Sequence, residues 1–208
     1  MNKLKKLGIA MGDSNKAASI FENYFPDFLT IDYNKPSDYI GQLWNRYLKI
    51  SEKERNSNQN GKIFEYLLAT LLIREKILPL FLSAKVTFVP NVIYDLMLYT
   101  EDNIPWCISA KTSLRERYKQ ADLEAIALKY VHRRAKSYLV TLDIEAGKNV
   151  KTKIKSGDVI GLDDVVIANS PDFDELVYQM KSLSFKLPGK VDIITSNQII
   201  TKESISIL

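Results

Sequence analysis

The sequence contains a single cysteine, Cys107, and a single histidine, His132. One cysteine cannot form an internal disulfide, and so few sulfur and imidazole ligands argue against an all-protein zinc site. No stretch approaches the roughly 18 consecutive apolar residues of a membrane helix. The basic start, MNKLKKLGIAMGDSN, has too short an apolar stretch before Asp13 for a secretory signal. These absences predict a cytoplasmic protein without a membrane span.

Glycine-rich nucleotide motifs are also missing. The glycines of AMGDSNKA and KSGD do not form a P-loop, and no Gly-x-Gly-x-x-Gly occurs, so no nucleotide cofactor is expected. The net charge of +4 over 208 residues permits a polyanionic partner without requiring one. The placement of the charge is more informative, because basic residues recur between positions 111 and 136: Lys111, Arg115, Arg117, Lys119, Lys129, Arg133, Arg134 and Lys136.

Apolar periodicity predicts helices and strands along the chain. Helices are expected at 35–50, 62–78, 115–136 and 170–183, and Pro79 should end the second of them. Strands are expected within 85–100, with a break at Pro90-Asn91, and at 106–111, 137–144 and 164–169. The Asn-rich segment 51–61 and the basic, glycine-containing segment 145–163 are predicted to be loops. The last 25 or so residues are expected to form a strand or an arm.

This order predicts an α/β fold with a mixed β-sheet flanked by helices. A chain of 208 residues fits one domain with one core. We expect an N-terminal helical part at about 1–60, a core at about 61–185 and a C-terminal arm at about 186–208.

Asp95 and Lys111 are the first candidates for a functional site. Asp95 lies in the run VIYDLML, where a β-rich segment should be apolar, and a carboxylate buried there is costly without a cation. A turn centred on Asp102-Asn103 would pair Asp95 with Ala110 or with Lys111, and the second register places both side chains on one face. A carboxylate supplies oxygen ligands for Mg²⁺, and a lysine beside it can orient or activate a water. The pair therefore indicates phosphodiester cleavage.

Further acids are needed to complete such a site. Sites of this kind commonly carry an acid two residues before the lysine, where this chain has Ser109. Glu124, two helical turns beyond Arg117, could point back toward Lys111 and hold metal with Asp95. Glu65 is set in the apolar run IFEYLLATLL and could assist, although a salt bridge with a basic neighbour would also explain it.

These residues resemble the PD-(D/E)xK nucleases with a displaced catalytic acid, which are restriction endonucleases of the EcoRII, PspGI, SsoII and NgoMIV type. The resemblance covers about residues 57–145 and includes Arg115-Glu116-Arg117 shortly after Lys111. It implies a restriction-endonuclease-like core and a homodimer that uses Mg²⁺ to cut double-stranded DNA at a CCGG or CC-N-GG palindrome. It also implies that an N-terminal helix could hold a flipped base, for which Trp44 and Arg46 are candidates.

The chemistry of Arg115-Glu116-Arg117 fits base recognition. Guanine offers N7 and O6 to a guanidinium, and cytosine offers an amino group to a carboxylate, so the trio suits a CC:GG step. A symmetric dimer would read such a step twice. Lys119, Arg133 and Arg134 are candidates for contacts with the DNA backbone.

Less specific interpretations stay open at each position. Arg115-Glu116-Arg117 could be a salt-bridged helix start, and Trp44 could be a core residue. The chain could instead be a repair, junction or phage nuclease of the same fold without strict sequence specificity. It could also be an inactive DNA-binding or protein-interaction module in which Ser109 marks a decayed site.

Overall fold

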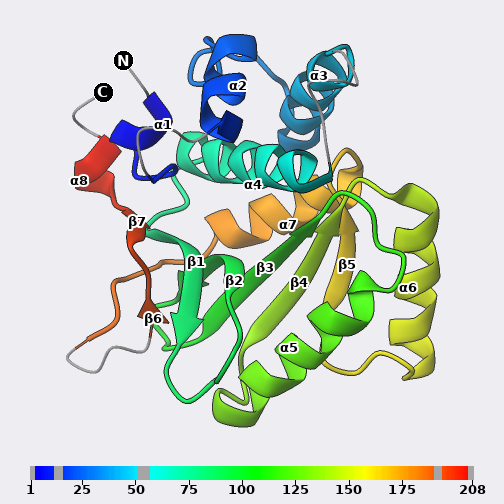
Figure 1. Ribbon diagram of the computed structural model, residues 1–208. Helices are drawn as coiled ribbons and strands as arrows, with labels where there is room; N and C mark the ends of the chain where they lie inside the picture. The colour runs from blue at the N-terminus through cyan, green and yellow to red at the C-terminus, as the bar shows by residue number, and fades with distance from the viewer. Residues whose placement is uncertain (1–2, 12–15, 51–56, 190–193, 206–208) are drawn as a thin grey trace.

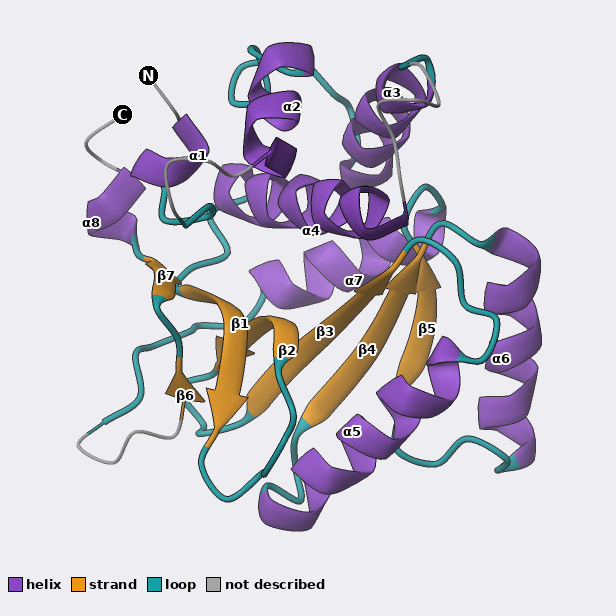
Figure 2. Cartoon of the chain, viewed as in Figure 1, coloured by secondary structure: helices purple, strands orange, loops and turns teal. Residues whose placement is uncertain are grey.

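The computed structural model describes residues 3–11, 16–50, 57–189 and 194–205. The helices are α1 (Lys3–Lys6), α2 (Lys16–Tyr24), α3 (Pro36–Leu48), α4 (Ser57–Arg74), α5 (Arg117–Val131), α6 (Ile144–Ser156), α7 (Pro171–Lys181) and α8 (Lys202–Ile205). The strands are β1 (Leu80–Val86), β2 (Tyr94–Tyr99), β3 (Pro105–Lys111), β4 (Lys136–Thr141), β5 (Asp164–Ile167), β6 (Ile194–Thr195) and β7 (Gln198–Ile200). The predicted α/β class is confirmed (Figure 2).

The strands form a seven-stranded mixed sheet in the order β5-β4-β3-β2-β1-β6, with β7 also paired to β1. β1, β2 and β3 are antiparallel neighbours, whereas β3, β4 and β5 run parallel. The parallel strands need crossovers, and α5 and α6 supply them (Figure 1). The C-terminal residues extend the sheet through β6 and β7, which agrees with the expected strand.

Alternating residues of the central strands face two apolar layers. Trp106, Ile108 and Val140 pack with α4 and α7 on one side of the sheet. Leu139 and Val165 pack with α5 and α6 on the other side. Figure 1 shows the same layering, with α4 above the sheet, α7 behind it and α5 in front. Helices therefore cover both faces of the sheet around β3.

Two predicted loops are wrong in part. Helix α6 occupies most of the segment expected to be a basic loop: Asp143 accepts the N–H of Ala146 at its start, and Gly157 ends it with φ of 82°. Gly147 is not a loop signal either, because an added Cβ would stand 3.3 Å from Ile167 Cγ1. Helix α4 begins at Ser57, inside the segment predicted to be a loop, and ends at Arg74 rather than near Pro79. The rest of that predicted loop, 51–56, lies outside the described residues.

A close backbone approach fixes the middle of α5. The N–H of Gly161 donates to Asp122 Oδ1 at 2.6 Å, and that of Leu162 donates to the same oxygen at 3.1 Å. A Cβ on Gly161 would stand 2.3 Å from the carbonyl oxygen of Asp122. Only glycine fits between the α6–β5 connection and the helix without displacing one of them.

Gly161→Ala is therefore expected to lower the free energy of unfolding by about 1–3 kcal/mol through overpacking. Urea denaturation of the purified protein measures this change. Gly61→Ala is the matched control, because a Cβ there meets nothing within 4 Å and alanine favours the helix by up to about 1 kcal/mol. Equal stability of the Gly161→Ala variant and the wild type would contradict the close approach.

No helix in the described part of the chain is long and apolar enough to cross a membrane.

Candidate active site

Asp95 and Lys111 lie side by side where β2 begins and β3 ends. Lys111 Nζ is 2.8 Å from Asp95 Oδ2, and the side chains are only 18% and 19% exposed. The predicted register was wrong, because Leu96 pairs with Ile108 and Tyr99 with Pro105. Continued by one residue, this register sets Asp95 opposite Ser109 rather than opposite Ala110 or Lys111. Lys111 is two residues further on the same face, so the predicted proximity holds in a different register.

The carboxylate of Asp95 accepts a hydrogen bond from the backbone of β3. Its Oδ2 accepts the N–H of Ala110 at 2.8 Å, and Ser109 Oγ lies 3.5 Å from the same oxygen. With the bond from Lys111 Nζ, three hydrogen bonds converge on this one oxygen and fix the carboxylate against β3. Asp95 Oδ1 takes no part in these bonds, so one oxygen of the group stays available for a further ligand.

Glu65 approaches Asp95 from α4. It lines a small cavity with Lys62 and Ser83, and Ser83 lies across from Asp95 in the β1–β2 register. Burial raises the pKa of Glu65, and the negative charge of Asp95 raises it further, while Lys62 and Lys111 oppose the rise. The expected salt bridge of Glu65 with a basic neighbour is present, because Lys62 Nζ lies 2.5 Å from Glu65 Oε2.

Glu124 approaches the pair from α5. Burial raises the pKa of its carboxyl, Asp95 adds to this rise, and both a hydrogen bond from Gln120 and the charge of Lys111 oppose it. The bond from Gln120 Nε2 to Glu124 Oε1 measures 2.7 Å. The hydroxyl of Tyr94 donates to the carbonyl oxygen of Glu124 at 3.1 Å and joins α5 to the residue before Asp95. The helix turn that carries Glu124 is thus attached to the start of β2.

This acid set fits Mg²⁺ on its donor chemistry. Within the described residues, no three side chains of His, Cys, Asp and Glu stand close enough together to hold a metal ion. Mg²⁺ does not need three, because one or two carboxylates with waters and a phosphate complete its shell. Burial is the main cause of the raised pKa values of Glu65 and Glu124, and the negative charge of Asp95 adds to both, a repulsion that a divalent cation would relieve.

The Arg115-Glu116-Arg117 segment forms the exposed turn that leads into α5. Arg115 has φ of 38°, Glu116 precedes the helix, and Arg117 is its first residue. Glu116 forms an ion pair with Lys119, which lowers the pKa of the Glu116 carboxyl through a direct hydrogen bond. The salt-bridged helix start raised as an alternative is therefore present, but an exposed pair of this kind is weak and can exchange partners.

A residue outside the predicted site holds this turn in place. Asp143 Oδ2 accepts the N–H of Leu114 at 3.2 Å, while its Oδ1 caps α6 through the N–H of Ala146. Leu114 itself is fully buried. The turn is thus anchored at the residue before Arg115, and its charged side chains extend into solvent.

The other candidates lie in separate parts of the molecule. Trp44 packs its ring against those of Tyr47 and Phe64, as expected of a core residue. Arg46 lies 3.2 Å from Asp27 Oδ1 and also donates to the carbonyl oxygen of Tyr24, so its contacts are with the end of α2 and the turn that follows it. Arg133 and Arg134 are exposed in the turn after α5.

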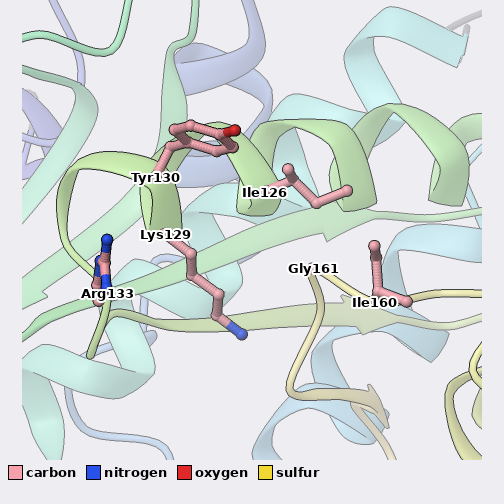
Figure 3. Close-up of a pocket in the computed structure, with 6 residues that line it drawn as sticks. All are labelled: Ile126, Lys129, Tyr130, Arg133, Ile160 and Gly161. Atoms are coloured by element: carbon pink, nitrogen blue, oxygen red, sulfur yellow. The ribbon is translucent and has the colours of Figure 1, made fainter.

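A surface pocket of about 400 Å³ lies on α5, apart from the carboxylates (Figure 3). Its walls come from α5, the turn after it and the α6–β5 connection: Ile126, Lys129, Tyr130, Arg133, Ile160 and Gly161. Lys129 is paired with Asp163 at 2.8 Å. None of the predicted catalytic residues lines this pocket.

Two residues near the candidate site were not predicted from the sequence. Lys62 stands one helical turn before Glu65, and this spacing in KIFE was the available signal. Asp143 carried only the signal of a helix-capping residue, which the loop prediction for that region hid.

The sheet and its flanking helices form a restriction-endonuclease-like fold. Among solved structures, the chain resembles one titled "Restriction endonuclease PspGI-substrate DNA complex", with a TM-score of 0.52 and 17% sequence identity. The likeness covers 82% of this chain and 83% of that chain. No family model matches the sequence, and the search of curated proteins found no match. At this identity the likeness establishes the fold.

Proposed function

We propose that the chain is a Mg²⁺-dependent endonuclease that cuts double-stranded DNA as a homodimer at a short palindrome containing CC:GG. The observation that carries the proposal is the Asp95–Lys111 ion pair at 2.8 Å. Glu65 on α4 and Glu124 on α5 lie near enough for the charges of this pair to shift their pKa values. The structural neighbour of the same fold is a restriction endonuclease in complex with its DNA substrate.

The residues divide by role in this proposal. Asp95 and Glu124 would hold the cation, and Glu65 would assist from α4. When bound, a divalent cation supplies Lewis acidity toward a phosphoryl oxygen and neutralises charge that develops at phosphorus. Lys111 Nζ, fixed by Asp95, would donate to the attacking water and orient it toward the phosphate. The low exposure of the pair strengthens these interactions relative to water.

Digestion of plasmid DNA with Mg²⁺ tests the proposal. Discrete fragments with CC:GG at their ends are expected, and mapping the ends gives the site and the stagger of the cut. A smear would favour a nuclease without sequence specificity, a candidate supported by the Glu116–Lys119 ion pair. Binding without cleavage in Mg²⁺ or Mn²⁺ would favour an inactive module.

Glu116→Ala is expected to relax the sequence preference before it affects stability. Each lost contact with a cytosine amino group should reduce discrimination by about 1–3 kcal/mol at that position. Cleavage of oligonucleotides that carry single substitutions at the C positions measures this loss.

The matched control is Glu145→Ala, because Glu145 also forms an exposed ion pair three residues from its lysine. Unchanged discrimination in the Glu116→Ala variant would assign Glu116 to the helix start alone.

A further inference from the structure

Lys62 is a second lysine at the candidate active site, and it forms a second lysine–carboxylate pair there. Its Nζ lies 2.5 Å from Glu65 Oε2, as Lys111 Nζ lies 2.8 Å from Asp95 Oδ2. On the proposed function, this second pair bears on how the DNA strand is held at the site.

The register of the sheet brings the two pairs together. Lys62 and Glu65 line the same small cavity as Leu82 and Ser83 of β1. Leu82 pairs with Leu96, so Ser83 lies across from Asp95 on β2. Lys62 thus reaches the site from α4, whereas Lys111 reaches it along β3.

The two lysines differ in how far they are enclosed. The Lys111 side chain is 18% exposed and faces a carboxylate that also bonds to the backbone of β3. The Lys62 side chain is 41% exposed, while that of its partner Glu65 is 21% exposed. An ammonium group has three donors, and the bond to Glu65 uses one of them. Lys62 can therefore keep Glu65 as a partner and donate outward to a second acceptor.

The negative charge of the site requires a nearby cation if a phosphate is to bind there. Asp95, Glu65 and Glu124 are acidic, so a phosphodiester that approaches them is repelled unless cations offset the charge. A lysine ammonium is a compact charge that suits a phosphate oxygen. We propose that Lys62 binds a phosphate of the DNA strand that enters the site and acts as a positioning residue, while it holds the Glu65 carboxylate in place.

The salt dependence of DNA binding tests this role in the full chain. Lys62→Gln removes the charge and keeps a hydrogen-bond donor for Glu65. Binding of a cognate duplex, identified by the plasmid digest, is measured with Ca²⁺ at several salt concentrations. The slope of log K against log [salt] should become less negative by about 0.9, the contribution of one phosphate contact. Binding should be weaker by roughly three- to tenfold. Lys62→Arg should restore the slope, because it restores the charge.

Lys148→Ala is the matched control, because Lys148 forms an exposed ion pair with a glutamate three residues away on α6. It should keep the slope of the wild type. An unchanged slope in Lys62→Gln, or an equal fall in Lys148→Ala, would overturn the assignment. If Lys62→Gln loses cleavage but keeps the wild-type slope, Lys62 holds Glu65 in place and does not bind a phosphate. Failure of the wild type to bind duplex DNA would instead overturn the proposed function itself.

Discussion

Lys111→Ala is expected to abolish DNA cleavage and to leave binding of the cognate duplex intact. The ammonium group lies 2.8 Å from Asp95 Oδ2, and on the proposed function it would orient the attacking water. Loss of such a group in an enclosed site reduces the rate by about 10³-fold or more. Single-turnover cleavage with Mg²⁺ and gel-shift binding with Ca²⁺ measure the two effects separately.

A stability measurement must accompany this variant, because Asp95 loses its ion-pair partner. The Ala110 N–H still bonds to Asp95 Oδ2, so the strand ends should stay together. Lys136→Ala is the control, because Lys136 also pairs with an aspartate at a strand end, Asp163, at 3.0 Å. Cleavage by the Lys111→Ala variant at the wild-type rate would exclude Lys111 from the chemistry.

Glu124→Ala should reduce cleavage on the order of 10²-fold or more, since it removes one of the two carboxylates assigned to the cation. The double variant Ser109→Glu/Glu124→Ala should recover at least part of that loss. Ser109 Oγ already lies 3.5 Å from Asp95 Oδ2, so a longer acidic side chain there can reach the same region. The exchange also keeps the number of acids at the site unchanged, which limits repulsion with Asp95.

The concentration of Mg²⁺ that gives half-maximal cleavage is the decisive measurement for this pair of variants. It should rise in Glu124→Ala and fall again in the double variant. Glu145→Ala, an exposed glutamate on α6, should match the wild type. A full-rate Glu124→Ala variant would show that another acid fills the role assigned to Glu124, with Glu65 as the alternative at the site.

The antiparallel pair of strands was predictable because short local signals determine it. Runs of mostly apolar residues define β2 and β3, and the short connection between them makes antiparallel pairing the expected arrangement, which brings Asp95 near the end of β3. The register was not predictable, because pairing of Tyr99 with Pro105 centres the turn on Asp102 alone. Asn103 has φ of 62°, a local conformation that the residue order does not specify.

The contributions of the helices were harder to predict, since they depend on packing between distant segments. Glu124 reaches the site because Tyr94 and Asp122 hold α5 at particular points. Helix α6 was hidden because its glycines resemble loop residues, although Gly157 ends the helix and Gly147 packs closely against β4 and β5.

The hydrogen bonds that hold α5 at Asp122 would link the recognition of DNA bases to the cleavage of the DNA strand. Arg117 and Glu124 both lie in α5, and between them Asp122 accepts a hydrogen bond from the backbone N–H of Gly161. On the proposed function, the separation between the base pair that is read and the bond that is cut is then a property of a rigid body. One residue inserted between Arg117 and Glu124 would turn the acid by about 100° and advance it by about 1.5 Å. Substitutions in the Arg115–Arg117 turn can therefore alter the base preference, whereas changes in the length of α5 would uncouple recognition from cleavage.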